Sequence, residues 1–164
     1  MITIRDLVRF WDTALNILYN RQGFVNEFKK VIAEYGITRE SKIFDVSAGT
    51  GFLALDLKKD GYHIAINDAS KRMLRLLKVN AANFTLDKIE VTNIPWQLLS
   101  KNVKRQYDLL LCRGNSLVYA KSWHKKVHDL TNAREVILSS LRNFYNLLKP
   151  RGILWIDITS DEEI

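Results

Sequence analysis

The sequence has a single cysteine, Cys112, among its 164 residues. One cysteine excludes a disulfide within the chain and argues against a zinc site built on cysteine ligands. No apolar run approaches the ~20 residues that a membrane-spanning helix needs. The apolar pattern near the N-terminus is interrupted by Arg5, Asp6, Arg9 and Asp12, which is typical of an amphipathic helix and not of a signal peptide. We therefore expect no membrane partner and a cytoplasmic location.

The chain also lacks features that would point to other architectures or sites. It has no internal repeat, low-complexity segment or linker, and no GxxxxGK[ST] run of the kind that cradles phosphates in P-loop proteins. Its three histidines, His63, His124 and His128, do not have the spacing of a metal site. With 47% hydrophobic residues, the chain is predicted to form one domain, 1–164, that is large enough for a core.

The net charge of +7 is the one compositional hint of an anionic partner. A basic surface can attract nucleic acid or anionic ligands. The basic residues occur as short, scattered doublets, however, and not as one tract with interleaved aromatic residues. The doublets are Lys29-Lys30, Lys58-Lys59, Lys71-Arg72 and Lys125-Lys126. This distribution favours solvated helix faces, so nucleic acid is not the favoured partner.

Strand patterns alternate with helix patterns along most of the chain. Strands are predicted at 42–46, 62–67, 88–92, 107–113 and 152–158. Helices are predicted at 4–20, 24–35, 52–59, 70–82, about 96–103 and 130–148. This alternation predicts an α/β fold with a parallel sheet and helices on both faces. Segments 108–112 and 153–156 are almost wholly apolar, as expected of strands that are buried on both sides.

Two helix ends have recognisable signals. Gly36 is the expected C-cap of the helix at 24–35. Asp129 or Thr131 is the expected cap at the start of the helix at 130–148, and Pro150 and Gly152 are expected to close that helix before a strand that begins at Ile153.

Residues 43–52 (IFDVSAGTGF) pass from a strand pattern into a glycine turn and then a helix pattern. Such a turn leaves backbone N–H groups pointing outward, and Gly49 and Gly51 have no Cβ to keep a ligand from the main chain. Asp68 ends the next strand pattern, 23 positions after Asp45 (68 − 45). An acid about 20 residues beyond a glycine turn suits the ribose hydroxyls of a nucleoside. We therefore predict a nucleoside-bearing cofactor, with a purely structural turn as the alternative.

The glycine pattern does not by itself choose the cofactor. The GxGxxG of NAD-binding proteins is incomplete, because positions 49–54 read Gly-Thr-Gly-Phe-Leu-Ala, although that fingerprint tolerates alanine at its third place. In open α/β sheets, ligands bind at the carboxyl ends of the strands. The segments at those ends concentrate the Gly, Asn, Ser and Asp residues of the chain. They are 47–51, 67–70, 93–96, 113–120 and 158 onward.

Four segments carry a resemblance to a known family. They are 45–51 (DVSAGTG), 67–74 (NDASKRML), 112–116 (CRGNS) and 147–157 (LLKPRGILWID). The first three resemble DVACGTG, VDAS followed by two residues and ML, and CLGNS. On these motifs the chain is identified as a member of the class I S-adenosylmethionine-dependent methyltransferases. It is most similar to the glycine N-methyltransferase and glycine/sarcosine methyltransferase group, over about residues 40–160.

The resemblance implies a Rossmann-like, mostly parallel sheet, with N-terminal helices at 1–38 and a cofactor-binding core at 40–164. It also implies S-adenosyl-L-methionine as cofactor, with the glycine turn against its methionine part and Asp68 on both ribose hydroxyls. Asp45 is implied to order the turn and orient the amino group, while Met73 and Trp96 lie near the adenine. Ordinary helix packing is the alternative for Met73. The implied cofactor-binding residues are Asp45, Ser47, Ala48, Gly49, Thr50, Gly51, Asp68, Ala69, Met73, Trp96 and Cys112.

The implied reaction is methyl transfer to the nitrogen of a small-molecule amine. Because the sulfonium is already activated, catalysis is mostly alignment and desolvation, so neither a catalytic triad nor a metal is expected. Asn115 is the candidate for holding the substrate, with a turn residue as the alternative, and Tyr119 is the next candidate. The glycine enzymes place a carboxylate-binding arginine after the last matched strand, where this chain has Thr159. A bidentate carboxylate clamp is therefore not expected there.

Other functions stay open at this level. The positive charge motivates methyl transfer to nucleic acid or protein, but residues 113–116 read Arg-Gly-Asn-Ser where adenine N6-methyltransferases have [DNS]PP[YFW]. The family normally has two more strands after the last strand predicted here. We therefore expect a truncated chain or one part of a split enzyme, including a non-catalytic cofactor-binding subunit. An open sheet edge would favour a homo-oligomer or a complementing chain.

Overall fold

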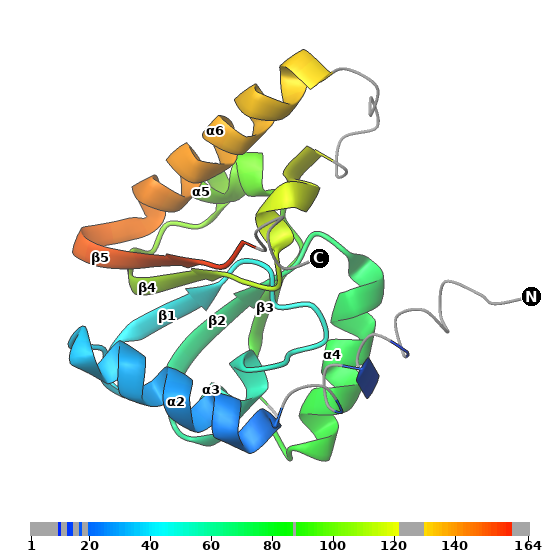
Figure 1. Ribbon diagram of the computed structural model, residues 1–164, viewed down its shortest axis with the longest axis vertical. Coiled ribbons are helices and arrows are strands. Elements are labelled where there is room, and N and C mark those ends of the chain that lie inside the picture. Colours follow the sequence, from blue (N-terminus) through cyan, green and yellow to red (C-terminus); the bar gives the residue numbers. More distant parts are fainter. Residues whose placement is uncertain are drawn as a thin grey trace, which may run out of the picture.

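The computed structural model describes residues 20–86, 88–121 and 130–158, together with Phe10, Thr13, Ala14 and Ile17. One sheet of five parallel strands, in the order β3-β2-β1-β4-β5, forms its centre (Figure 1). The strands are β1 (Lys42–Asp45), β2 (His63–Asn67), β3 (Glu90–Thr92), β4 (Tyr107–Cys112) and β5 (Leu148–Ile156). The predicted α/β fold with a parallel sheet is confirmed.

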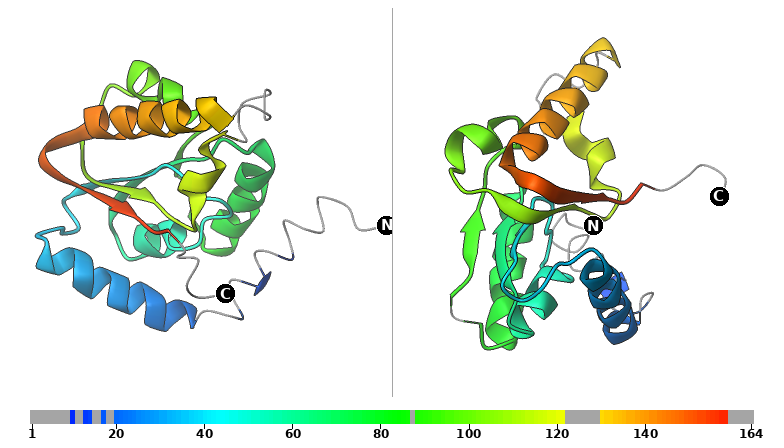
Figure 2. Two further views of the ribbon diagram at one scale, coloured as in Figure 1. Left: turned by 45° about the horizontal axis from the view of Figure 1, so that its top comes forward. Right: turned by 90° about the vertical axis from the view of Figure 1, so that its left-hand side faces the viewer.

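Helices cover both faces of this sheet, as predicted (Figure 2). One layer contains α2 (Arg21–Glu34), α3 (Ala54–Lys59) and α4 (Lys71–Asn83). The other contains α5 (Leu99–Asn102) and α6 (Leu130–Leu147), with the short 3-10 helices η1 (Trp96–Leu98) and η2 (Ser116–Lys121). Most of the helix predicted at 4–20 lies outside the described residues, as do Asp129, His124, His128 and Thr159.

The alternation of side chains along each strand divides the core into two clusters. In β4, Leu109 and Leu111 pack with the α2, α3 and α4 layer, whereas Leu110 and Cys112 pack with the α6 layer. All four side chains are fully buried. A strand between two helix layers has no solvent face, which explains why segment 108–112 is apolar at almost every position.

Gly36 ends α2 as the sequence predicts. Its φ is +78°, and its N–H donates to the carbonyl of Ala33 at 2.9 Å. The N–H of Ile37 donates to the carbonyl of Ile32 at 3.0 Å, which completes a Schellman arrangement. This turn redirects the chain from the helix layer toward β1, the strand that leads to the glycine turn.

The boundary between α6 and β5 differs from the prediction. The strand begins at Leu148, directly after the helix, and its register shifts from Tyr107 opposite Leu148 to Leu109 opposite Ile153. A bulge within β5 therefore contains Pro150, which has no N–H to donate to the ladder. Because of this bulge, β5 begins directly after α6. Pro150 and Gly152 therefore lie within the strand and do not separate it from the helix.

Candidate cofactor site at the carboxyl ends of the strands

The topology brings the predicted site segments together at one end of the sheet. From β1 the chain builds outward through β2 to β3, and it then crosses to β4 on the other side of β1 and continues to β5. The order therefore reverses between β1 and β4. Ligands in open α/β sheets bind outside the carboxyl ends of the strands at such a reversal. The loops after β1, β2 and β4 all lie at this end (Figure 1).

The glycine turn after β1 uses its two central glycines differently. Gly49 has φ of +56° and Gly51 has φ of +98°, a region that side chains rarely adopt. A Cβ on Gly51 would lie 2.6 Å from the Leu55 side chain, whereas a Cβ on Gly49 would meet nothing within 4 Å. Gly51 therefore allows α3 to pack closely against the turn. Gly49 borders open space, where a ligand can approach the main chain.

Asp68, at the end of β2, contacts this turn directly. Its Oδ2 accepts from the Gly49 N–H at 2.8 Å, and its Oδ1 accepts from the Ser70 N–H at 2.7 Å. Asp68 is 7% exposed, and this burial raises the pKa of its carboxyl, while the hydrogen bonds from Ser70 and Gly49 oppose the rise. The two sequence features that predict a nucleoside site are therefore adjacent in the fold.

Asp45 and Ser47 join the end of β1 to the end of β4. Burial raises the pKa of Asp45 to about 7, against the opposing influence of the nearby Arg113 guanidinium and the Ser47 N–H. The Ser47 N–H donates to Asp45 Oδ1 at 3.0 Å. The Ser47 hydroxyl accepts from the Arg113 N–H at 2.8 Å and donates to the Arg113 carbonyl at 3.2 Å. The turn is thus held to the neighbouring strand by a single side chain.

Two amide side chains that the sequence reasoning did not name as cofactor-binding residues support these loops. Asn67 is fully buried, and its Nδ2 donates to the carbonyl of Ile94 at 3.1 Å while its Oδ1 accepts from the Ile94 N–H at 2.9 Å. Asn80 donates from α4 to the carbonyl of Thr50 at 3.0 Å. The position of Asn67, a polar residue at the end of an apolar strand pattern, could have indicated its role in holding the loops. Nothing in the helix pattern of α4 distinguishes Asn80 from its neighbours.

Several predicted cofactor residues lie beneath the loops. Trp96 is 3% exposed, and its indole N–H donates to the Val46 carbonyl at 2.7 Å. Cys112 is fully buried, and burial raises the pKa of its thiol to about 12. Ala48 and Thr50 are also buried. Trp96 therefore supports the end of β1, just before the turn, from below.

Other predicted residues lie nearer the surface of the same end. Ala69 and Met73 are partly buried where α4 begins, and the Met73 N–H donates to the Ser70 hydroxyl, the N-cap of α4, at 3.4 Å. Asn115 has φ of +53°, and its N–H donates to Asp157 Oδ1 at 2.8 Å. Tyr119 lies on η2 and is 54% exposed. The fold therefore brings Asn115 to the strand ends, beside the residue that follows β5.

Arg113, which the sequence reasoning did not select, is a largely buried cation at these loops. Its side chain is only 12% exposed. The guanidinium carbon lies 4.8 Å from the ring centroid of Phe24 and 5.8 Å from that of Phe52, the residue after Gly51. Its Nε is 3.8 Å from Asp157 Oδ2.

The chain was compared with known proteins. No family model matches it. A glycine/sarcosine/dimethylglycine N-methyltransferase from Actinopolyspora halophila is 30% identical over 115 residues, which are 70% of this chain and 18% of that protein. A glycine/sarcosine N-methyltransferase from Aphanothece halophytica is 28% identical over 155 residues, which are 94% of this chain and 52% of that protein. The chain spans about half the length, or less, of these curated relatives.

The motifs, the topology and these similarities agree. The chain is similar to the class I S-adenosylmethionine-dependent methyltransferases, over about half the length of these curated relatives or less. Solved structures show the same fold at lower identity. A methyltransferase from Clostridium acetobutylicum has a TM-score of 0.72 at 18% identity, covering 96% of this chain and 58% of that chain. The amino pentose methyltransferase CalS10 from Micromonospora echinaspora has a TM-score of 0.70 at 13% identity, covering 94% of this chain and 58% of that chain.

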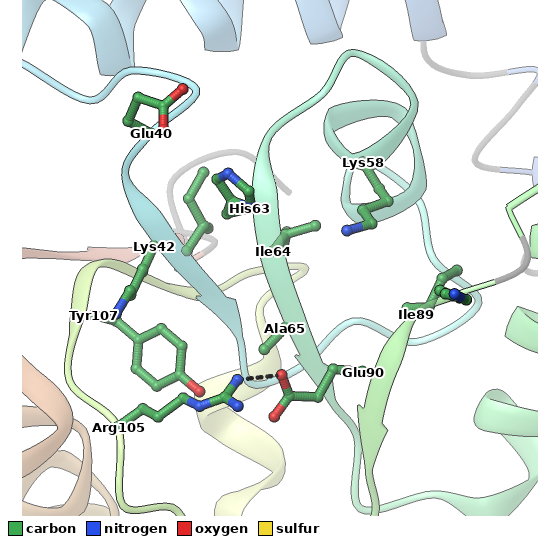
Figure 3. Close-up of a pocket in the computed structure, with 12 residues that line it drawn as sticks. Glu40, Lys42, Lys58, His63, Ile64, Ala65, Ile89, Glu90, Arg105 and Tyr107 are labelled. Carbon is green, nitrogen blue, oxygen red and sulfur yellow. Dashed lines mark hydrogen bonds and ion pairs between the residues drawn. The ribbon is translucent and has the colours of Figure 1, made fainter.

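A concave region of the chain lies at the opposite end of the sheet (Figure 3). This hollow of about 960 Å³ is lined by polar and apolar side chains near the amino ends of β1 to β4, among them Lys58 and His63. Arg105 and Glu90 form an exposed ion pair of 2.7 Å within it. It has neither a glycine turn nor a buried acid, so its size does not make it the better candidate.

Among the described residues, no three His, Cys, Asp or Glu side chains are grouped so as to hold a metal ion. No helix in that part of the chain is both long and apolar enough to cross a membrane.

Proposed function

We propose that this chain binds S-adenosyl-L-methionine and serves methyl transfer to the nitrogen of a small-molecule amine. The observation that carries the proposal is the 2.8 Å contact between the Gly49 N–H and Asp68, beside the open space at Gly49. The names of the relatives, glycine/sarcosine N-methyltransferases, support the reaction class. We take 1–164 as one domain, with helices at 1–38 and the cofactor-binding core at 40–164.

The residues present fit this cofactor. The absence of a Cβ at Gly49 lets a ligand reach the main chain, and the neighbouring Asp68 offers carboxylate oxygens to a pair of ribose hydroxyls. When bound, the cofactor supplies an activated methyl group. The work of the protein is then to align the amine with that group and to exclude water. Asn115 and Tyr119 are the proposed substrate-holding residues.

Calorimetric titration with S-adenosylmethionine tests the proposal. Asp68→Ala should weaken binding by about 1.5–3 kcal/mol, because hydrogen bonds to a charged group are lost. Asp60→Ala is the matched control. Asp60 is the partly buried C-cap residue of α3 and pairs with Lys29 at 2.6 Å, away from the glycine turn. Equal affinity of the wild type and Asp68→Ala would reject the role of Asp68. No binding to the wild type would reject the function.

The acceptor is proposed to be a neutral amine without a clamped carboxylate. The initial rate should then rise with pH as the amine loses its proton, which makes its lone pair available. A screen of amines for release of S-adenosylhomocysteine would identify the acceptor. Robust methylation of glycine with a low KM would contradict the absence of a carboxylate clamp. Lack of turnover despite cofactor binding would instead favour a non-catalytic, cofactor-binding subunit.

We also propose that the outer edge of β5 pairs with another strand. Within the described part of the chain, β5 pairs only with β4, and its apolar residues from Ile153 to Ile156 are only half-buried. An unpaired, apolar edge is a template for association with a second copy or a complementing chain. Sedimentation at micromolar concentration should show a dimer or larger species. A folded monomer would show that this edge is covered in another way.

A further inference from the structure

Arg113 lies among the acidic residues of the strand ends. Its Nε is 3.8 Å from Asp157 Oδ2, and its charge lowers the pKa of Asp45 against the larger effect of burial. The guanidinium also stacks on Phe24 of α2 and Phe52 of the glycine turn. Burying most of an arginine is costly unless its charge is used, either by partners within the fold or by a ligand.

The backbone of Arg113 is fastened to the glycine turn. The Ser47 hydroxyl bonds to both its N–H and its carbonyl, at 2.8 and 3.2 Å, and the Ser116 hydroxyl donates to the same carbonyl. The side chain therefore leaves the main chain from a defined place, at the reversal of strand order between β1 and β4. A site whose supports are fixed in this way can hold a ligand group without a large ordering cost.

The charges at this place match those of an amino acid. A free α-amino acid group carries an ammonium and a carboxylate on one carbon, and S-adenosylmethionine ends in such a group. Asp45 and Arg113 place a carboxyl and a guanidinium at the ends of neighbouring strands, and Asp68 lies across the turn beside Gly49. A guanidinium has five N–H donors on a planar fork, which suits two carboxylates at once.

We propose that Arg113 binds the α-carboxylate of the amino-acid end of S-adenosylmethionine, beside Asp45. This inference rests on the proposed function, because it assigns a residue to the same cofactor. We assign the bound carboxylate to the cofactor and not to the methyl acceptor. The reason is that Arg113 is bonded to the glycine turn through Ser47 and packs on Phe52.

Two ligands that differ at the amino-acid end test the inference. S-Adenosylhomocysteine has that end, whereas 5′-methylthioadenosine keeps the nucleoside and the sulfur but lacks it. The two dissociation constants are measured by calorimetry for each variant. Arg113→Leu should weaken S-adenosylhomocysteine roughly 10- to 100-fold, the range expected for losing hydrogen bonds between charged groups. The affinity for 5′-methylthioadenosine should stay within about twofold of the wild type, because that ligand has no carboxylate to lose.

Arg21→Leu is the matched control for lost packing. Arg21 also stacks on Phe52, at 5.2 Å, but its guanidinium bonds to Asp56 of α3 instead of facing the strand ends. Arg21→Leu should leave the ratio of the two dissociation constants unchanged. If Arg113→Leu does not fold, Arg113→Lys carries the test, because it keeps the charge and should shift the same ratio by a smaller factor.

The outcomes separate this inference from the proposed function. Wild-type binding of both ligands, with equal losses for both in the Arg113 variants, would overturn the inference and leave the function standing. Affinities for both ligands that stay unchanged in the Arg113 variants would also overturn the inference and leave the proposed function standing. Binding of neither ligand to the wild-type chain would overturn the proposed function itself, and the inference with it.

Discussion

The acidic residues at the two ends of the sheet have pKa values that are shifted in opposite directions. At the carboxyl ends, Asp45 and Asp68 are 1% and 7% exposed, and burial raises the pKa of both. At the amino ends, Asp108 accepts hydrogen bonds from Lys149 at 2.7 Å and from the Lys42 N–H at 2.7 Å. Burial opposes its ionisation, but these two contacts outweigh that effect and the pKa of Asp108 is lowered.

This contrast separates a carboxylate that has an ion pair within the fold from two carboxylates that have none among the described residues. Asp108 ties β4 to β1 and pairs with a lysine, so it needs no further role. Asp45 and Asp68 are buried despite a cost to their charged forms, and neither has an ion pair of its own among the described residues. Buried groups with perturbed pKa values are enriched at functional sites. This contrast supports the proposed cofactor site at the carboxyl end, although the hollow of about 960 Å³ lies at the amino end.

The largest expected effect comes from neutralising Asp45. Because its pKa is about 7 in the folded chain and 3.8 in the reference state, the folded chain retains a proton that the unfolded chain releases between these values. Stability should therefore fall as pH rises from about 4 to about 7. Asp45→Asn removes this titration and should stabilise the fold at pH 8, by up to about 4 kcal/mol.

Urea unfolding at pH 5 and pH 8 measures this effect, with Asp60→Asn as the control. The free energy of unfolding of the wild type should decrease between the two pH values more steeply than that of Asp45→Asn. If both proteins show the same pH dependence, Asp45 does not carry a raised pKa, and the contrast between the two ends is weaker than described.

A smaller effect is expected from the glycines at the two ends. Gly51 and Gly61 both have positive φ, at +98° and +89°. A Cβ on Gly51 would overlap the Leu55 side chain at 2.6 Å, whereas a Cβ on Gly61 would lie 3.8 Å from its nearest neighbour, Arg39. Gly61→Ala should cost about 1–2 kcal/mol from backbone strain alone. Gly51→Ala should cost about 2–4 kcal/mol, because overpacking adds to that strain.

Thermal or urea unfolding of the two alanine variants distinguishes these contributions. Equal losses at the two positions would show that α3 moves away from the turn without cost, so that Gly51 is needed for its backbone conformation only. Cofactor binding to Gly51→Ala, measured in parallel, should also weaken if the turn shifts.

The smallest effect is expected at Asp108. Asp108→Asn keeps an oxygen for the Lys42 N–H but loses the ion pair with Lys149, whose side chain is 39% exposed. Solvent screening limits the loss to less than about 1 kcal/mol. Because the pKa of Asp108 is lowered on folding, its contribution is present above the unfolded value and is lost as pH falls through the folded value. The free energy of unfolding of the wild type should therefore change more between pH 6 and pH 3 than that of Asp108→Asn. A destabilisation of Asp108→Asn that persists at pH 3 would contradict this account.

Sequence reasoning predicted what depends on neighbouring residues along the chain. The order of strands and helices, the glycine turn and the C-cap at Gly36 all follow from local patterns of apolar residues and from backbone conformations that favour glycine. The proximity of Asp68 to Gly49 was also predictable, because consecutive parallel strands place their carboxyl ends side by side. The boundary of β5 was not, because the bulge depends on its register with β4.

The sequence by itself therefore determined the α/β alternation, the resemblance to class I methyltransferases and the end of the sheet at which we expect a ligand. Only the tertiary structure decided which polar residues line that end and which support it from below. Trp96 and Cys112 are buried there by packing against the α6 layer, and Arg113 meets Phe24 and Phe52 from distant segments. The physical reason is that burial, pKa and stacking depend on residues brought together across the sheet, and no local pattern records those distances.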